Sequence, residues 1–495
     1  MTKKLIVSII VVLIAGAFVG STFYINSLNK AQYEQVTQLD MNNLKASVAS
    51  ALKPFFESQG LDSTVLLDLA EELDISLEAS PYVSGFLHSE GTLTLKLKMH
   101  ALDPHTLEAP SSTLYIDARF SNLPFGTSVF SISSPDSEVK ELFSDGKIGS
   151  IELNGTTIAL RLSDVFIQRD TWRDTKDTLS LKGFLLTLHT TKDFALKSVL
   201  FTIPEFSLVE RGDRFGFTDL VVEGSYDTPL DLQTLLKYTT EGAILAGKSS
   251  VTLRSLEVTS GIKLTLDRFS VKGVEKLGSS PDLGDIAMDL AFKNLVIADN
   301  FPYASEDRKN LKKLNFTDFS STLEIQNLHR FVIGYLNSFN DPYAFLLRYG
   351  EDFERKIQAI FSSNPKLAIK DSSFLFNGKK LTYSGNGQIT PEFGEFNFTI
   401  SSKFSIQELL DQYKGVGDFD TIIEGLSEYF IKQGDSAYGT TLRYHEIHDG
   451  AQSFKVNDTV IYQSRYESPD NADEETLDEP ILDEDDLQEL DSQSK

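Results

Sequence analysis

The chain of 495 residues contains no cysteine. Disulfide bonds, thiolate metal sites and a lipid attached to an N-terminal cysteine are therefore all excluded. One tryptophan and seven histidines leave few side chains that could serve as metal ligands or general bases. The sequence therefore predicts neither a metal site nor a cofactor.

Positive charge is also scarce, because 46 lysines and arginines face 72 acidic residues and the net charge is −26. Nucleic acid is excluded as a partner, since binding phosphates needs a surplus of basic side chains. Nucleotide-binding loops, nucleophile elbows and zinc-protease motifs are absent as well. The sequence therefore predicts no catalytic residue, and it indicates a protein that is not an enzyme.

The longest apolar run lies at the N-terminus, from Leu5 to Ile25, and follows Lys3 and Lys4. This length matches the roughly 20 residues that a helix needs to cross a bilayer, and flanking lysines stay in the cytoplasm. We expect a single-pass anchor with the body outside the cytoplasm. The alternative is a cleaved signal peptide, since Ala15–Ala17 has the small residues of a cleavage site. Both interpretations export the body.

The remaining chain divides by pattern into four further segments after an anchor at 1–28. Residues 29–73 have apolar residues at helical spacing and predict a stalk. Residues 74–400 predict a β-rich body with a few short helices, and 401–466 predict a helical segment followed by closing strands. Residues 467–495 hold 13 acidic residues and one lysine, and this composition predicts a disordered tail.

Strict alternation of apolar and polar residues dominates the body, as in Thr92–Met99 and Glu395–Ile400. Such alternation is typical of antiparallel strands with one buried face and one solvated face. Turn signals are found at Ser89–Gly91, Ser144–Gly146, Gly212-Asp213 and Gly385–Gly387. We expect a mainly β fold of the α+β class, with a large, twisted antiparallel sheet.

Three segments interrupt the strands with helical spacing, and we expect them to cover the sheet. They are Leu230–Tyr238, His329–Phe361 with a break near Asp341-Pro342, and Ser405–Lys432 with a break at Gly415 and Gly417.

The one-sided apolar stripes of the strands are the strongest candidate for a site. Two such stripes that face each other form the core of a sandwich, whereas an open, bent sheet would present them as a groove for acyl chains. The periodicity predicts the stripes equally well in both cases. The candidate groove residues are Leu93, Leu95, Leu97, Phe396 and Phe398.

The plan of residues 1–466 resembles the YdgA-like family of bacterial inner-membrane proteins. The segments that carry the resemblance are Lys3–Ile25, Ser84–Phe86 with Gly91–Leu95 as an early strand pair, Asn364–Phe374 running into Asn377–Gly385, and Phe454–Val460 as a closing strand. The resemblance implies an inner-membrane anchor, a periplasmic body and self-association, and it implies no established activity. The acidic tail departs from the family's plan.

These observations lead to one main hypothesis and two alternatives. The main hypothesis is a non-enzymatic periplasmic protein, tethered to the membrane, whose sheet surface or apolar groove binds a lipid-like ligand or an envelope protein. The first alternative is an assembly factor that self-associates through the stalk and the sheet edges. The second alternative is a hydrolase with a non-standard carboxylate site.

Overall fold

The computed structural model describes residues 73–83, 88–99, 111–121, 127–170, 176–231, 234, 243–299, 313–337, 352–413, 419–434, 437–447 and 452–464. The anchor, almost all of the stalk and the acidic tail that the sequence predicts lie outside these residues. Within them, no helix combines the length and the apolar character that crossing a membrane requires.

The described strands belong to a single antiparallel sheet, which confirms the predicted mainly β class. The first strands are β1 (Leu73–Ala79), β2 (His88–Met99), β3 (Ser111–Ser121), β4 (Ser128–Ser133), β5 (Lys147–Asn154), β6 (Thr157–Leu162), β7 (Val165–Asp170), β8 (Lys176–Lys182), β9 (Leu185–Thr190), β10 (Leu196–Glu210) and β11 (Asp213–Leu230). The later strands are β12 (Gly247–Thr259), β13 (Ile262–Leu277), β14 (Leu283–Asp299), β15 (Leu314–His329), β16 (Lys366–Phe376), β17 (Lys379–Ile389), β18 (Phe393–Ser402), β19 (Ile431–Gln433), β20 (Ala437–Ile447), β21 (Gln452–Val456) and β22 (Thr459–Ser464).

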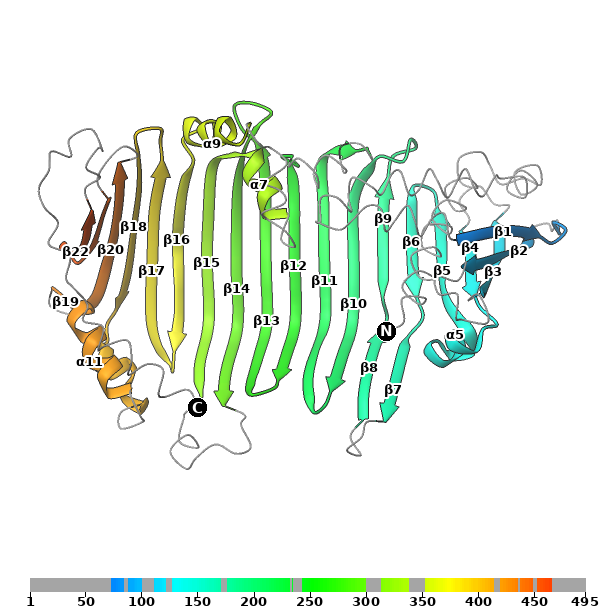
Figure 1. The fold of residues 1–495 in the computed structure, drawn as a ribbon, viewed down its shortest axis with the longest axis horizontal. Coiled ribbons are helices and arrows are strands. Elements are labelled where there is room, and N and C mark those ends of the chain that lie inside the picture. The colour runs from blue at the N-terminus through cyan, green and yellow to red at the C-terminus, as the bar shows by residue number, and fades with distance from the viewer. Residues whose placement is uncertain are drawn as a thin grey trace, which may run out of the picture.

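Most strands pair with their neighbours in the sequence, so the sheet runs from β1 to β22 nearly in chain order (Figure 1). The exceptions are β6, which pairs with β9, β10, whose first half pairs with β9 and whose second half pairs with β8, and β18, which pairs with β20. Tight turns join the long strands, as at Arg211-Gly212 and Asn377-Gly378, where all four residues have positive φ. Two-residue turns of this kind match the twist of a hairpin.

The alternation shifts by one residue in the middle of the long strands. In β13, the apolar residues Leu264 and Leu266 are followed by Phe269 and Val271, and Arg268 between them has a φ of 52°. Similar positive φ values occur at Asp219 of β11, Asp318 of β15 and Asp371 of β16. Each is a bulge-like irregularity, which bends a strand and re-aims the side chains that follow.

Ring contacts show that apolar side chains on both sides of this shift share one face. Phe316, before the shift in β15, lies 6.0 Å from Phe374, and Phe319, after the shift, lies 6.3 Å from Tyr383. The rings of Phe374 and Tyr383 are themselves 6.2 Å apart. The shift therefore keeps one continuous apolar face along the whole length of the strands.

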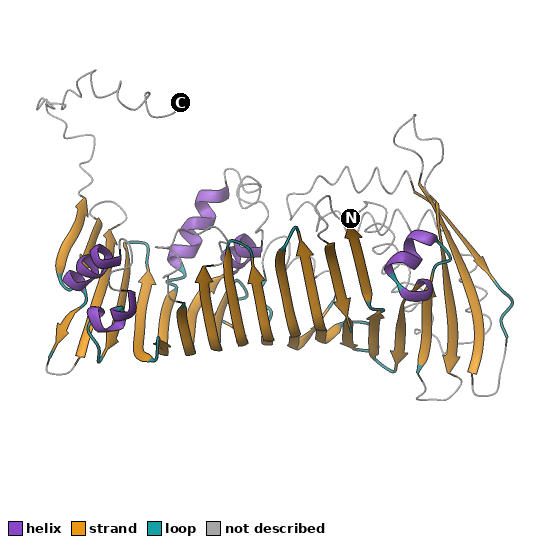
Figure 2. Ribbon diagram, turned by 90° about the horizontal axis from the view of Figure 1, so that it is seen from below, coloured by secondary structure: helices purple, strands orange, loops and turns teal. Residues whose placement is uncertain are grey.

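The helices are short and lie beside the sheet. They are α5 (Ser137–Leu142), η1 (Ser144–Gly146), α7 (Arg330–Asn337), α9 (Asp352–Ser362), α10 (Ile406–Leu409), η3 (Asp411–Tyr413) and α11 (Phe419–Tyr429). The helices predicted within 329–361 and 405–432 are thus confirmed in the described residues. In Figure 2, α7 and α9 lie on one side of the curved sheet. Residues 232–233 and 235–238 of the predicted segment Leu230–Tyr238 lie outside the described residues, and Leu230 itself ends β11.

Among the described residues, the larger buried core forms at the N-terminal end of the sheet. Leu93, Leu95 and Leu97 of β2 pack there against side chains of β3 to β5 and against Val139 of α5 and Phe143. A second and smaller cluster joins Ile333 of α7 to Leu328 and Ile244. The long middle strands therefore lack a core of the usual sandwich type in the described residues.

Two predicted turns are wrong. Ser89–Gly91 lies inside β2 and Gly385–Gly387 lies inside β17, because both segments pair with a neighbouring strand over their full length. The single closing strand Phe454–Val460 is also wrong, since Asn457 and Asp458 form the turn between β21 and β22. Glycine and asparagine mark turns by their local freedom, but pairing with a neighbour decides whether the chain reverses.

Candidate apolar binding face

Cross-strand pairing sorts the apolar side chains of the middle strands into rows that run across the sheet. We call one of these the short row, because it crosses fewer strands than the row described next. It runs from β7 to β16 and consists of Val165, Leu181, Phe206, Phe217, Leu256, Leu266, Leu295, Phe316 and Phe376. Every side chain in the short row is half-buried. At about 4.8 Å between strands, the row is roughly 38 Å long.

The long row runs from β6 to β21 on the other side of the mid-strand shift. Its apolar members are Ile158, Leu188, Val199, Met288, Leu323, Ile369, Phe398, Leu442 and Val456, and glycine or serine takes the positions in between at Gly224, Ser249, Gly273 and Gly385. Tyr383 links the two rows, because its ring lies 5.9 Å from Phe398 and 6.2 Å from Phe374, which neighbours Phe316.

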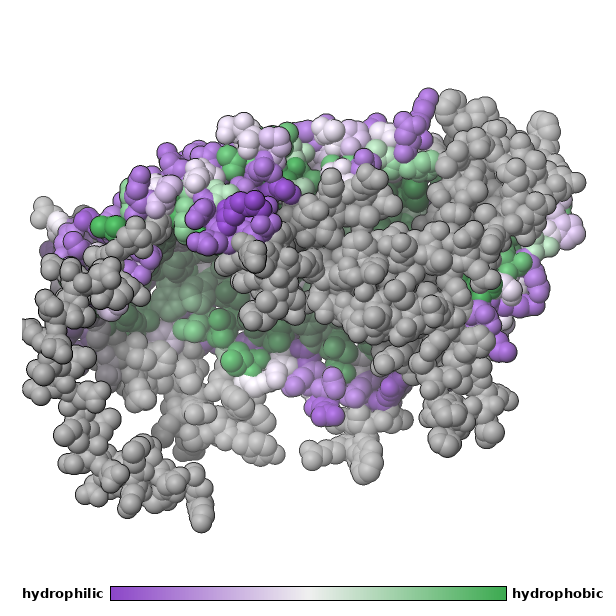
Figure 3. Space-filling view, turned by 45° about the horizontal axis from the view of Figure 1, so that its top comes forward, coloured by the Kyte–Doolittle hydropathy of each residue, from purple (hydrophilic) through white to green (hydrophobic). Residues whose placement is uncertain are grey.

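The apolar face is hollowed, and the described residues cover only part of it. Figure 3 shows hydrophobic residues gathered inside the hollow, with hydrophilic residues along its borders. The helix α7 covers part of the face, since Ile333 and Val332 pack with Ile286 and Ile325. Among the described strands there is no second sheet to cover the rest. A contiguous surface of half-exposed apolar side chains, such as this one, is typical of a site that binds another apolar molecule or segment.

Aromatic side chains lie at the two ends of the short row. At one end, Phe143 forms a bridge with Val165 and is only 3% exposed. At the other end, Tyr413 is 0% exposed, and its ring stacks on Phe376 with 6.5 Å between centroids. The short row therefore contacts a buried ring at each end, and Lys379 of β17 follows Phe376 in register.

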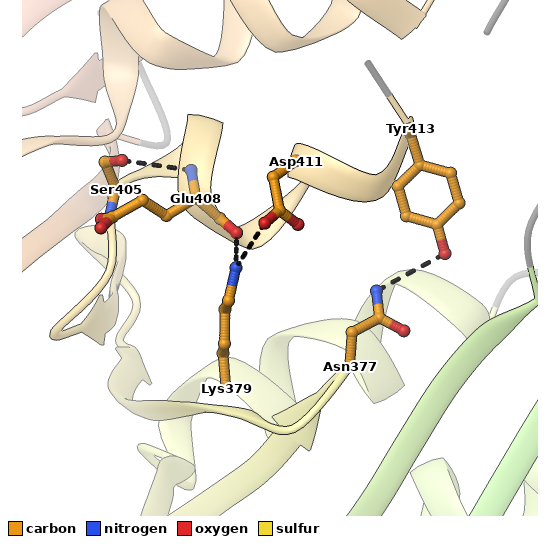
Figure 4. Close-up of polar contacts among 6 residues, drawn as sticks. All are labelled: Asn377, Lys379, Ser405, Glu408, Asp411 and Tyr413. Atoms are coloured by element: carbon orange, nitrogen blue, oxygen red, sulfur yellow. Dashed lines mark hydrogen bonds and ion pairs between the residues drawn. The ribbon is translucent and has the colours of Figure 1, made fainter.

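Tyr413 is fixed by polar contacts around the β16–β17 hairpin, as Figure 4 shows. Its hydroxyl donates to the carbonyl of Lys313 at 3.2 Å and accepts from Nδ2 of Asn377 at 3.5 Å. Asn377 belongs to the hairpin turn, and its backbone N–H donates to the carbonyl of Asn315. These bonds allow a phenol to be buried, since both hydrogen-bonding roles of the hydroxyl are satisfied.

The segment that leads through α10 and η3 to Tyr413 is fixed as well. A capping box joins Ser405 and Glu408 at the start of α10, and these hydrogen bonds keep the pKa of the Glu408 carboxyl below its ordinary range. Lys379 of β17 lies 3.4 Å from Asp411 and donates to the carbonyl of Glu408. The segment from Ser405 to Tyr413 is therefore attached to the end of the β16–β17 hairpin at several points.

One carboxyl group lies among apolar neighbours on the same face. Glu275 of β13 is in register with Ile286 and Gly247, and its Oε1 accepts the backbone N–H of Leu245 at 2.7 Å. Burial raises the pKa of Glu275, while the hydrogen bond from Leu245 opposes this change. Because that bond fixes the loop before β12, Glu275 has a structural role. The described residues contain no cluster of histidine and carboxylate side chains that could hold a metal ion.

The structure separates the five candidate groove residues predicted from the sequence. Leu93, Leu95 and Leu97 lie in the closed N-terminal core, with exposed fractions of 0%, 1% and 4%. Phe396 and Phe398 lie on the half-buried apolar face, with their rings stacked at 6.3 Å. A direct role in ligand binding stays a prediction for all five, and only the two phenylalanines are accessible in this structure.

Sequence reasoning missed the residues of the short row and the aromatic rings at its ends. A signal for the row was present, because pairs of polar residues such as Asp267-Arg268 separate two alternating stretches. That signal would have indicated the shift and the continuous face. Phe143 and Tyr413 carry no local signal, since their place at the ends of the row depends on pairing between distant strands.

Comparisons with known proteins found no match: no family model, no curated protein and no solved structure is similar to this chain. The resemblance to the YdgA-like family therefore stays a prediction from the sequence.

Proposed function

We propose that the protein binds the hydrocarbon chains of lipids on its apolar face. In this proposal it is a non-enzymatic envelope protein of the YdgA-like type, tethered to the bacterial inner membrane, with its body in the periplasm. The observation that carries the proposal is the short row, whose apolar side chains stay half-buried across the middle of the sheet.

The chemistry of the face favours hydrocarbon over an extended peptide. The backbone groups of β10 to β16 already pair within the sheet, so the face offers few donors or acceptors to an occupant. A peptide strand on this face would leave its own N–H and C=O groups unpaired, at about 1–3 kcal/mol for each buried group. A hydrocarbon chain has no such groups and gains about 0.8 kcal/mol for each buried methylene.

The sequence supports lipid as the source of that hydrocarbon. The apolar run Leu5–Ile25 predicts a membrane anchor, which would keep the body within reach of a bilayer. Lipid is then the most abundant apolar molecule near the face. The predicted stalk, residues 29–73, would set the distance between the face and the membrane.

A matched pair of substitutions tests this proposal. Val271 lies on the apolar face, and the adjacent Lys272 is exposed on the opposite face of β13. Full-length protein would be purified in mild detergent, analysed by native mass spectrometry and extracted for lipid. We expect bound lipid in the wild-type protein and in Lys272→Asp, and its loss in Val271→Asp. Circular dichroism would show that both variants are folded. Absence of lipid from the wild-type protein would contradict the proposal.

A second candidate function is assembly through the sheet edge. The terminal strand β22 has the uncharged sequence TVIYQS, and Val460, Ile461 and Tyr462 are about half-exposed. In the described part of the chain β22 pairs only with β21, so its outer edge can accept another strand. Ile461→Lys would place a charge at this edge. If the protein assembles there, crosslinked oligomers should disappear in this variant while lipid content stays unchanged.

A further inference from the structure

Aromatic side chains form a continuous row across the last strands of the sheet, at the far end from the N-terminal core (Figure 1). This aromatic row consists of four partners in register, namely Phe396 of β18, Tyr444 of β20, Phe454 of β21 and Tyr462 of β22. Because Phe396 lies on the apolar face, its partners in register lie on that face too. Tyr462 is 54% exposed at the sheet edge, and the other three side chains are half-buried.

A carboxylate lies beside the aromatic row on the same face. Glu446 follows Tyr444 by two residues along β20, so both side chains point to the same side of the sheet. The Tyr444 hydroxyl donates to Oε2 of Glu446 at 2.7 Å, and Nε2 of Gln452 donates to Oε1 at 3.0 Å. The first bond raises the pKa of Tyr444, since the carboxylate stabilises the protonated phenol. Both donors are neutral, so they fix the position of the carboxylate without cancelling its charge.

Polar, aromatic and aliphatic side chains follow one another along this end of the apolar face. On β20 the order is Glu446, Tyr444 and Leu442, with about 6.8 Å between successive members. The paired strand β21 repeats the order, with an amide at Gln452, a ring in the middle and an aliphatic side chain at Val456. Leu442 and Val456 belong to the long row. The order therefore leads from a fixed charge, through rings, to the surface proposed to bind hydrocarbon.

We infer that the aromatic row and Glu446 bind the ammonium headgroup of a lipid whose hydrocarbon chains lie on the apolar face. The inference rests on the proposed lipid-binding function and adds the class of headgroup. The faces of tyrosine and phenylalanine rings attract a cation through their quadrupole, and a carboxylate attracts it by its charge. Joining the cation to hydrocarbon lets one molecule satisfy both ends of the order along β20.

An anionic headgroup fits this end of the face poorly. The basic residues closest in sequence to the aromatic row are Arg443 and Lys455, which alternate with Tyr444 and Phe454 and so lie on the opposite face. Arg443 also pairs there with Asp458, at 2.6 Å. A phosphate or carboxylate beside the aromatic row would therefore meet the charge of Glu446 with neither basic group on its own side of the sheet.

The test uses the full-length protein, stripped of lipid in mild detergent. The probe is an equimolar mixture of phosphatidylethanolamine and phosphatidylglycerol with identical acyl chains, so the two lipids differ only in the headgroup. Native mass spectrometry would count the bound molecules of each. We expect the wild-type protein to retain more phosphatidylethanolamine. Glu446→Gln should reduce this preference by about three- to tenfold, while the total amount of bound lipid changes little.

Two further variants and a free amine make the result specific. Glu395→Gln removes the same charge from β18, but Glu395 alternates with Phe396 and lies on the opposite face, so this variant should keep the wild-type preference. Tyr462→Leu keeps an apolar side chain at the exposed edge and removes the ring, and the preference should fall by about two- to fivefold. Free ethanolamine at the same concentration should not displace phosphatidylethanolamine, because it has no hydrocarbon chains.

Circular dichroism would show that each variant is folded. Equal retention of the two lipids by the wild-type protein, or an unchanged preference in Glu446→Gln or Tyr462→Leu, would overturn the headgroup site and leave the proposed function standing. An equal loss of preference in Glu395→Gln would do the same, since the effect would then come from net charge. Displacement of the lipid by free ethanolamine would overturn a lipid as the source of the ammonium group. Binding of neither lipid by the wild-type protein would overturn the proposed function, and this inference with it.

Discussion

The ring of Phe396 lies directly over Gly387 of the adjacent strand, and a Cβ on that glycine would stand 2.9 Å from Cδ2 of the ring. The same relationship recurs between Gly385 and Phe398, where the corresponding distance is 3.1 Å. Two glycines in β17 therefore make room for two stacked rings of β18. This arrangement explains why a segment with the composition of a turn is part of a strand.

Substitution of Gly387 by alanine should destabilise the protein. The new methyl group would approach both the Phe396 ring and the carbonyl of Glu395, each at 2.9 Å, so the ring or the strand must move. We expect a loss of about 1–3 kcal/mol in the free energy of unfolding, measured with urea. The control is Gly394→Ala in β18, where a Cβ would have no neighbour within 4 Å. Equal effects of the two substitutions would refute the close fit.

Substitution at Arg268 tests the mid-strand shift. Its φ of 52° lies in the left-handed region, which costs roughly 1–2 kcal/mol for side chains other than glycine. We expect Arg268→Gly to be at least as stable as the wild-type protein and more stable than Arg268→Val by about that amount. Thermal or urea unfolding would measure the difference. If valine and glycine were equally stable here, the backbone would not require this conformation.

Loss of the Tyr413 hydroxyl should weaken the attachment of the α10 segment. Tyr413→Phe leaves the carbonyl of Lys313 and the amide of Asn377 without this partner, at a cost of about 1–2 kcal/mol. This cost would be measured as the difference in the free energy of unfolding between the variant and the wild-type protein in urea titrations. Tyr115→Phe, on a side chain that is 37% exposed, is the control and should have a smaller effect. A stability of Tyr413→Phe equal to that of the wild-type protein would show that the hydroxyl does not hold the segment.

Stability should depend on pH through Glu275. Burial raises the pKa of this carboxyl in the folded state, so between the ordinary pKa and the raised one the folded protein holds more protons than the unfolded chain. Stability from this group therefore falls as the pH rises through that window. Glu275→Gln removes the titrating group and still offers an oxygen to the backbone N–H of Leu245. The free energy of unfolding of this variant should therefore decline less steeply with pH than that of the wild-type protein.

Urea titrations at a series of pH values would measure this effect, with Glu210→Gln on an exposed side chain as the control. A decline in Glu275→Gln as steep as that of the wild-type protein would show that the carboxyl does not contribute.

The strands of the body could be predicted from the sequence because period-two alternation is a local property. Thr92–Met99 lies within β2 and Glu395–Ile400 within β18, as that pattern indicates. The glycines of β17 and the segment Ser89–Gly91 misled the same reasoning, because turn residues act locally while strand pairing is decided by neighbours far along the chain.

The sequence could predict that the candidate site is an apolar strand surface, but not which strands form it. Leu95 and Phe398 have the same alternating surroundings in the sequence, yet Leu95 is 1% exposed in a closed core while Phe398 lies on the open face. Alternation predicts which side of a strand is apolar, but it does not predict which part of the protein packs against that side. The difference depends on the curl of β1 to β6, where α5 and neighbouring strands close over the face.

The sequence by itself determined the strand-rich character of the body, the apolar side of each strand and the places where two polar residues interrupt the alternation. Each of these depends on residues within one strand. Only the tertiary structure decided that the strands form one open sheet, that the stripes join into rows, and that Phe143 and Tyr413 lie at the ends of the short row. The physical reason is that a row is made by register between many strands, and register is set by pairings that no single segment contains.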